Sequence, residues 1–314
     1  MPSALTTTQA ATIKAIVNLF ETSQVLGDYG QVTVISGDTG HLTFGRSQTT
    51  LGSGNLHDLV RQYCDNIGAR FRRRLADFLP RLKKKDIGLD TDPQLHNLLR
   101  ATADDPVMRD VQDEFFDDRY FEPAMKAAGS IGISTPLGCA VVYDSLVHGS
   151  WDRIRDRVKG TPATLGEQDW ITAYVGKRRD WLAASTRADL RATVYRMDAV
   201  SRLIELDQWG LELPLVVRGA EISVATLSGR PPGTYEGPQP GTRDLTFVTT
   251  APLLRGLDVR LVQLALSDRG ADIRADGVFG RASSQRVADH QRTAGLPITG
   301  VADRALVLAL ATAV

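Results

Sequence analysis

Apolar side chains recur at helical spacing along most of the first 220 residues. Ile13, Ile16, Val17 and Phe20 occupy positions i, i+3, i+4 and i+7, so they share one face of a helix, for which Thr8 is the expected N-cap. The same periodicity predicts helices over about 54–80, 93–102, 106–117, 135–148, 151–158 and 167–203. The pattern therefore favours a mainly helical first part of the chain.

One segment in this part is typical of a β-hairpin instead. Residues 31–36 (QVTVIS) are rich in β-branched side chains, residues 37–40 (GDTG) are turn formers, and residues 41–44 (HLTF) complete the expected return strand. We therefore expect a mainly α fold of the α+β class with one small β-sheet.

The density of Gly and Pro rises abruptly between Gly229 and Gly241. Eight of these thirteen residues are Gly or Pro, which neither a helix nor a central strand tolerates. This boundary predicts a first domain over 1–228, a linker over 229–241 and a small second domain over 242–314. We expect few contacts to cross such a linker.

Net charge and hydropathy limit the kinds of molecule that this protein is expected to bind. The 37 basic and 37 acidic side chains give a formal net charge of zero, so neither nucleic acid nor a membrane is indicated. No apolar run is long enough to predict a transmembrane helix, and no secretory signal is visible in the first 20 residues. A local basic cluster is either a solvated surface or a site for a polyanion such as a wall polymer. It comprises Arg70, Arg72, Arg73, Arg74, Arg81, Lys83, Lys84 and Lys85.

Cysteine and histidine positions give no sign of a metal site. Cys64 and Cys139 can form at most one bridge, and we expect both to be buried thiols. The five histidines show neither i, i+4 pairing nor clustered carboxylates, and no Gly-rich loop of the phosphate-binding kind follows a strand. We therefore expect no metal and no nucleotide.

Two carboxylates stand out by their surroundings. Glu21 ends the first predicted helix beside its apolar face, where a raised pKa would suit a general acid. Asp38 lies in the hairpin turn, where an ionised carboxylate can polarise a water. Glycoside hydrolysis uses this combination of acid and base. Spacing alone is weak evidence, however, in a chain with 37 acidic residues.

Several short motifs, in consistent order over roughly residues 8–220, strengthen this interpretation. They are Glu21-Thr22-Ser23, residues 37–45 (GDTGHLTFG), 52–55 (GSGN), 105–107 (DPV), 120–124 (YFEPA) and 143–149 (YDSLVHG). Together they resemble glycoside hydrolase family 46, the chitosanases. The resemblance implies a lysozyme-like fold of two mainly helical lobes around a cleft, with a small sheet in one lobe. It also implies hydrolysis of β-1,4 links between amino sugars with inversion.

The resemblance assigns roles to individual side chains. Glu21 matches the general acid of the family, Asp38 the general base, and Thr43 the threonine that helps to hold the attacking water. An inverting enzyme places its two carboxyls about 6.5–9.5 Å apart and needs no cofactor, because a water is the only co-reactant. A buried acid–arginine network of the family, which supports the catalytic acids, is matched by Asp144, Arg178 and Arg196. The alternative for these three is an ordinary surface ion pair.

One position departs from the family in a way that affects substrate choice. The family places an aspartate that pairs with a glucosamine ammonium where this chain has Asn55. An amide carries no charge, but it can form hydrogen bonds with a hydroxyl or an N-acetyl group. Residues 184–187 (ASTR) likewise stand where chitosanases tend to have acids. Both changes disfavour polycationic chitosan, unless they reflect neutral drift.

Residues 255–310 resemble the peptidoglycan-binding domain of three small helices. The matching segments are 255–259 (RGLDV), 262–266 (VQLAL), 276–280 (DGVFG) and 295–300 (GLPITG). We expect Phe279 to fill the core, and Gln263, Asp276 and Gln291 to define the fold rather than contact the ligand. Such a module raises the local concentration of polymer around an attached enzyme.

Three functions follow from these resemblances. The first is an inverting hydrolase of peptidoglycan, the second a chitosanase with a wall anchor, and the third a non-catalytic wall-binding protein. The expected substrate is a polysaccharide, met at the cell wall, in the periplasm or outside the cell by an unknown export route. We expect a monomer, which an immunity protein would inhibit if the chain is a delivered toxin.

Overall fold

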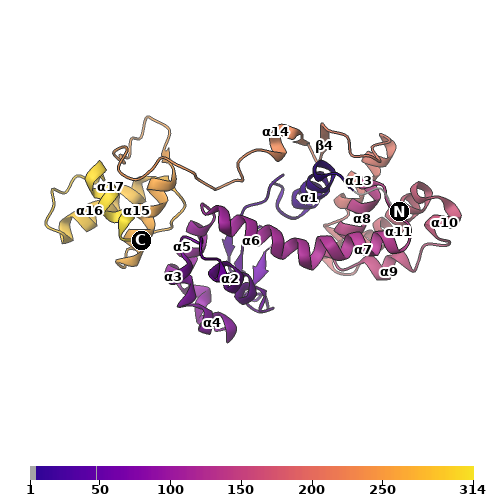
Figure 1. Cartoon of the computed structure of the whole chain (residues 1–314), viewed down its shortest axis with the longest axis horizontal. Helices are drawn as coiled ribbons and strands as arrows, with labels where there is room; N and C mark the ends of the chain where they lie inside the picture. Colours follow the sequence, from indigo (N-terminus) through magenta and orange to yellow (C-terminus); the bar gives the residue numbers. More distant parts are fainter. Residues whose placement is uncertain (1–4, 47) are drawn as a thin grey trace. The chain divides into compact units, whose positions relative to one another are not determined.

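The computed structural model describes residues 5–46 and 48–314, and the chain is mainly helical, as the sequence predicts (Figure 1). Two compact units form, and each combines two separate stretches of the chain. The first unit contains the N-terminal residues as far as Gly27 together with residues 114–230. The second contains residues 28–113 and 231–314. Among the described residues, no helix combines the length and apolar character needed to cross a membrane.

The first unit is built around helix α8 (Pro136–Val147), whose sequence is apolar on nearly every side. Helix α8 packs against α1 (Thr7–Thr22), α7 (Glu122–Ser130) and α11 (Glu167–Ala183). The remaining elements are α9 (Trp151–Arg155), α10 (Pro162–Leu165), α12 (Ala188–Arg191), α13 (Tyr195–Glu205), the hairpin β4 (Leu215–Val217) and β5 (Ala220–Ile222), and α14 (Val224–Leu227). Because apolar groups cover nearly every face of α8, that helix forms the centre of the core.

Helix α1 begins two residues earlier than the Thr8 cap would allow. Thr6 caps it, and Thr6 and Gln9 form a reciprocal capping box. The predicted face of Ile13, Ile16 and Phe20 is buried. The prediction of Thr8 as N-cap was wrong because Thr6 and Gln9 have the spacing of a capping box, which satisfies two backbone donors instead of one.

The second unit starts with a three-stranded antiparallel sheet, in which β2 (Thr43–Phe44) lies between β1 (Val32–Thr33) and β3 (Thr49–Thr50). The helices that follow are α2 (Asn55–Asp65), α3 (Arg72–Ala76), α4 (Leu79–Lys83), the 3₁₀ helix η1 (Ile87–Thr91) and α5 (Pro93–Thr102). Helix α6 (Pro106–Phe116) and the π-helical turn η2 (Asp117–Phe121) then lead the chain into the first unit.

Two long predicted helices are broken. The helix expected over 54–80 is three helices, because α2 ends at Asp65. Its C-cap Asn66 adopts an extended conformation, and a turn containing Gly68 follows. The helix expected over 167–203 is interrupted after α11, where the Ser185 hydroxyl accepts a hydrogen bond from the backbone N–H of Arg187 at 3.2 Å. Such local side-chain bonds compete with the helical backbone pattern.

The C-terminal part of the second unit contains three helices, as expected. They are α15 (Leu257–Asp268), α16 (Arg281–Thr293) and α17 (Arg304–Thr312), with a two-stranded pair of β6 (Leu254–Arg255) and β7 (Val278–Phe279). Phe279 is fully buried in their core. Gln263 donates hydrogen bonds to the Asp276 carboxylate and the Val278 carbonyl, so it joins the helix to the turn, as its predicted role in the fold requires.

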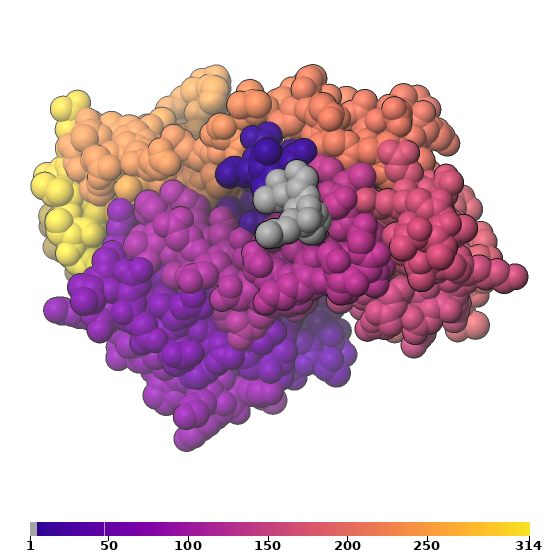
Figure 2. All heavy atoms as spheres, turned by 45° about the vertical axis from the view of Figure 1, so that its right-hand side comes forward, coloured from indigo at the N-terminus to yellow at the C-terminus, as the bar shows by residue number. Residues whose placement is uncertain are grey.

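Helix α15 packs directly against α5, so the expectation of few contacts across the linker was wrong. In the space-filling view, the yellow C-terminal residues border the purple part of the same unit (Figure 2). Asp104 and Arg260 form an ion pair at 2.9 Å, and both side chains are almost fully buried. The Asn97 amide donates to the Ser267 hydroxyl and the Ile273 carbonyl. A flexible linker composition does not exclude docking when apolar and polar groups on both sides are complementary.

Both cysteines are free and buried, which confirms the prediction of buried thiols. Burial raises the pKa of the Cys64 thiol to about 11, and that of Cys139 likewise to about 11. Each thiol is therefore protonated and unreactive near neutral pH.

Candidate active site

The last turn of α1 carries Glu21, the residue predicted to be the general acid. Arg196 on α13 donates a hydrogen bond to Glu21 Oε1 at 2.8 Å. The Glu21 side chain is 36% exposed, whereas that of Arg196 is 5% exposed. A mostly buried guanidinium thus holds one oxygen of a carboxyl that remains accessible, and Glu21 Oε2 makes no hydrogen bond within the described residues.

Aromatic packing fixes this end of α1. The Tyr195 hydroxyl donates to the Phe20 carbonyl at 2.6 Å, and the rings of Phe20 and Tyr195 meet edge to face at 6.2 Å. The Arg218 guanidinium lies 3.9 Å from the centre of the Tyr195 ring and donates to the Leu19 carbonyl. These contacts satisfy carbonyls that the helix end would otherwise leave unpaired, and they fix the position from which Glu21 projects.

Asp144 on α8 anchors Arg196 from behind. It accepts a hydrogen bond from Arg196 at 2.7 Å through Oδ1 and another from Arg178 through Oδ2. Asp144 is fully buried, which by itself would raise its pKa, but the two adjacent guanidinium groups keep the pKa below its ordinary value. Arg178 also donates to the Ser150 hydroxyl at 2.9 Å. The four residues Glu21, Arg196, Asp144 and Arg178 therefore form one continuous chain of charge-assisted hydrogen bonds.

His148 lies beside this chain of hydrogen bonds and adds no charge to it near neutral pH. Burial, together with the nearby Arg178 and Arg196, lowers the pKa of its imidazole to about 4.

Asp38 lies in the exposed loop between β1 and β2 of the second unit. Its backbone N–H donates to the Ile35 carbonyl at 3.1 Å, which closes a tight turn. A Cβ on Gly40 would lie 2.8 Å from Asp38 Oδ2, and a Cβ on Gly52 would lie 2.1 Å from the Thr39 carbonyl oxygen. A side chain at position 52 would displace the backbone of this loop, and one at position 40 would displace the Asp38 carboxylate.

Asp90 supports the same loop from η1. Its Oδ1 accepts a hydrogen bond from the Leu42 backbone at 2.8 Å, and its Oδ2 lies 2.9 Å from His41 Nδ1. Thr43 follows on β2, is 8% exposed, and donates its hydroxyl proton to the His41 carbonyl at 3.0 Å. Because that proton is committed, the Thr43 oxygen can act only as an acceptor toward a water.

A hollow of about 550 Å³ opens next to Asp38. Its lining residues include Val34, Ile35, Thr39, His41 and Asp90. Val34 and Ile35 are 40% and 64% exposed, so an apolar edge borders the carboxylate. A mixed surface of this kind suits a sugar ring, which has an apolar face and a polar rim.

Asn55, the expected substrate contact, begins helix α2. Its backbone N–H donates to the Ser53 hydroxyl at 3.2 Å. Lys85 approaches the same turn and donates from Nζ to the Gly52 carbonyl at 2.8 Å, while a Cβ on Gly54 would lie 3.3 Å from its Cε. An ammonium group therefore lies beside the turn that carries Asn55.

The predicted site residues fall into two groups. Glu21, Asp144, Arg178 and Arg196 meet in the first unit, while the second unit holds Asp38, Thr43 and Asn55. The catalytic roles of Glu21, Asp38 and Thr43 stay predictions, as do the substrate contact of Asn55 and the supporting roles of the other three.

Sequence reasoning missed Asp90 as the support of the Asp38 loop, and it placed Lys85 only within the basic cluster. No local pattern signals either contact, because each partner lies more than 30 positions away.

The basic cluster is partly neutralised. Arg74 forms an ion pair with Asp268 at 2.6 Å, and Arg81 pairs with Asp86 and Asp92. Within residues 5–46 and 48–314, no group of three or more His, Cys, Asp or Glu side chains is arranged to hold a metal ion.

Comparison with known proteins extends these observations. The model of glycosyl hydrolase family 46 matches residues 15–215, which is more than half of the chain. The chain belongs to glycosyl hydrolase family 46. It is therefore a glycoside hydrolase that acts on a polysaccharide, and a peptidoglycan binding domain follows at residues 255–310.

Individual relatives agree with this family assignment. A chitosanase of Bacillus subtilis (strain 168) is 26% identical over 226 residues, which cover 66% of this chain and 80% of the relative. A mutant chitosanase of Bacillus subtilis MY002, complexed with 6 GlcN, is 22% identical with a TM-score of 0.59 and covers 71% of this chain and all of its own. A Gynuella sunshinyii family 46 chitosanase with chitotetraose is 24% identical with a TM-score of 0.58, over 71% of this chain and 99% of its own. The family 46 part therefore has the lysozyme-like fold that the resemblance implied.

Proposed function

We propose that this family 46 enzyme hydrolyses β-1,4 bonds between glucosamine units, as in chitosan, with inversion at the anomeric carbon. The observation that carries the proposal is the hydrogen-bonded chain from Arg178 through Asp144 and Arg196 to Glu21. It fixes one oxygen of an accessible carboxyl and leaves the other free. The chitosanase relative from Bacillus subtilis (strain 168) supports glucosamine polymers as the substrate class.

In the proposed reaction, Glu21 donates a proton from Oε2 to the glycosidic oxygen as the bond to the anomeric carbon breaks. Asp38 removes a proton from a water, which attacks that carbon from the opposite face of the ring. The Thr43 hydroxyl oxygen accepts a hydrogen bond from the second O–H of this water, since its own O–H donates to the His41 carbonyl. The positive charge that develops on the sugar is balanced by the Asp38 carboxylate until the new C–O bond has formed.

The experiment that tests this proposal compares two polymers. Purified full-length protein is incubated with chitosan and with peptidoglycan side by side, and the soluble products are identified by mass spectrometry. Glucosamine oligomers from chitosan support the proposal. Release of N-acetylated muropeptides alone would contradict it in favour of the second candidate.

Peptidoglycan is that second candidate, and the turn before α2 favours it. Asn55 offers no negative charge to a glucosamine ammonium, and Lys85 places a positive charge next to the same turn. Two like charges near one subsite disfavour a polycationic substrate, whereas an N-acetylated sugar carries no ammonium. The peptidoglycan binding domain would hold either activity close to a cell wall, outside the cytoplasm.

A further inference from the structure

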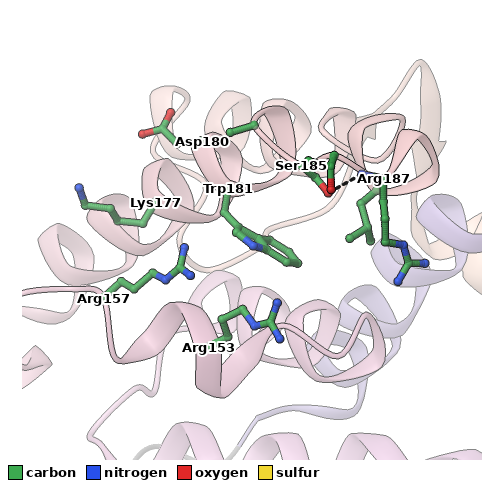
Figure 3. A pocket seen from close by; sticks show the side chains of 10 residues that line it. Arg153, Arg157, Lys177, Asp180, Trp181, Ser185 and Arg187 are labelled. Atoms are coloured by element: carbon green, nitrogen blue, oxygen red, sulfur yellow. Dashed lines mark hydrogen bonds between the residues drawn. The ribbon is translucent and has the colours of Figure 1, made fainter.

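A hollow of about 750 Å³ in the first unit has a basic lining (Figure 3). It lies between α9, the C-terminal half of α11 and the segment that leads into α12. Its lining includes Arg153, Arg157, Lys177, Trp181, Ser185 and Arg187. Four of these six side chains are cationic, so the hollow has a strong positive charge although the whole chain is neutral.

Three of the four cations have no anionic partner. Within the described residues, the side chains of Arg153, Arg157 and Lys177 make no hydrogen bond or ion pair, whereas their neighbours Arg155 and Arg179 are paired with aspartates. Asp180 is the single acid in the lining, and Figure 3 shows its carboxylate directed away from Arg153 and Arg157. The unbalanced charge is therefore available to an external anion.

An aromatic side chain gives the hollow a second kind of contact. Trp181 is half-buried and projects from α11 toward Arg153, whose guanidinium lies 5.7 Å from the centre of the ring (Figure 3). A tryptophan face packs well against the apolar face of a sugar ring, and a guanidinium pairs with an acidic group. Trp181 and Arg153 are close enough for one small ligand to contact both.

Hydrogen bonds fix the segment 185–187, which lines another side of the hollow. Arg191 donates to the carbonyls of Ser185 and Thr186 at 2.6 and 2.9 Å. Arg187 donates its backbone N–H to the Ser185 hydroxyl and pairs its side chain with Asp189. A pre-formed wall lowers the entropy that binding would otherwise lose.

We propose that this hollow binds a sugar that carries an acidic group, a carboxylate or a phosphate. The sugar ring would pack on Trp181, and the acidic group would pair with Arg157 and Lys177. Segment 184–187 (ASTR) provides the cationic Arg187. The inference does not depend on which polymer the enzyme cleaves, since it concerns binding alone.

Calorimetry on the full-length protein at two salt concentrations tests the inference. Four probes separate the sources of the anion: a muramic-acid disaccharide, a short poly(glycerol phosphate), an N-acetylglucosamine disaccharide and a single-stranded oligonucleotide. The Arg157→Glu/Lys177→Glu double variant reverses two exposed charges of the hollow. Lys126→Glu, on the exposed surface of α7, is the matched control.

We expect an acidic saccharide to bind, with a more than tenfold loss of affinity in the double variant and no loss in Lys126→Glu. Binding of the muramic-acid disaccharide identifies a carboxylate site, and binding of poly(glycerol phosphate) alone identifies a phosphate site. Equal binding of the neutral disaccharide, equal or tighter binding of the oligonucleotide, or unchanged affinity in the double variant would each overturn the inference. Hydrolysis of chitosan or peptidoglycan by the double variant is measured separately, so failure here leaves the proposed reaction intact.

Discussion

Arg196 binds Glu21 through a single oxygen, Oε1, at 2.8 Å, although the two residues are 175 positions apart. The guanidinium is oriented by Asp144, so its position does not depend on the accessible carboxyl. One oxygen of Glu21 is thus fixed while the other can face the substrate. An acid held in this way loses little entropy when it protonates a leaving group.

Replacing Glu21 by glutamine should abolish hydrolysis while the fold survives. The amide has nearly the same shape and can still accept the hydrogen bond from Arg196, but it has no proton to donate. We expect kcat to fall by about 10²–10⁴-fold or more. Glu122→Gln, an exposed change on α7, is the control and should retain full activity. Wild-type rates in Glu21→Gln would remove this residue from the mechanism.

Asp144→Asn tests the support behind the acid. The change leaves Arg178 and Arg196 buried without their shared anion, which should cost about 3–5 kcal/mol of unfolding free energy. Because Glu21 would lose its orientation, we expect kcat to fall more than KM changes. Urea unfolding and steady-state kinetics measure the two effects, and an unchanged kcat would show that the network is only structural.

The lowered pKa of Asp144 predicts how the stabilities of wild type and Asp144→Asn depend on pH. A depressed pKa in the folded state gives stability that is present above the unfolded pKa of about 4 and is lost as the pH falls below it. The stability gap between wild type and Asp144→Asn should therefore stay constant from pH 5 to 8 and narrow below pH 4. A gap that widens in acid would contradict this assignment.

Asp38→Asn should reduce hydrolysis as severely as the loss of Glu21, because no base would then activate the water. Proton NMR early in the wild-type reaction should show the inverted anomer as the first product. The exposed Asp303→Asn, at the N-cap of α17, provides a control for the change of an acid to an amide, since asparagine also caps helices. If the first product keeps the anomeric configuration of the substrate, Asp38 acts as a nucleophile and not as a general base.

Sequence patterns were sufficient where the signal is local. Helical periodicity located α1 and α8, and the motifs around Glu21 and Asp38 identified the family. The third strand, Thr49–Thr50, was missed because two residues are too few to show alternation. The breaks inside residues 54–80 and 167–203 were missed because apolar positions continue in phase across short polar turns.

Contacts between distant segments could not be predicted in the same way. Asp104 and Arg260 are ordinary charged residues in the sequence, and only the folded chain buries them together. The Gly- and Pro-rich segment between them correctly signalled a lack of regular structure. It carried no information about docking, because docking depends on the surfaces of α5 and α15.

The buried pair at this docked surface predicts an unusual pH dependence. Desolvation raises the pKa of Asp104 from 3.8 to about 6, despite the opposing effect of Arg260. A raised pKa means that the folded state loses stability as the pH rises from about 4 through 6, by roughly 3 kcal/mol at most. Thermal unfolding of the full chain should show this loss in wild type, and Asp104→Asn should remove it. Asp77→Asn, an exposed change, should leave the profile as in wild type.

Substrate choice should respond to the charges at the turn before α2. Asn55→Asp adds a carboxylate that can pair with an ammonium, and a charge-assisted hydrogen bond contributes about 1.5–3 kcal/mol. We expect kcat/KM on chitosan to rise about tenfold or more relative to peptidoglycan. Lys85→Met, which removes the adjacent ammonium but adds no acid, should shift the ratio in the same direction by less. Both substrates are measured at one ionic strength, since salt screens the added charge. If neither variant changes the ratio, Asn55 and Lys85 do not face the sugar, and peptidoglycan loses the observation that favours it.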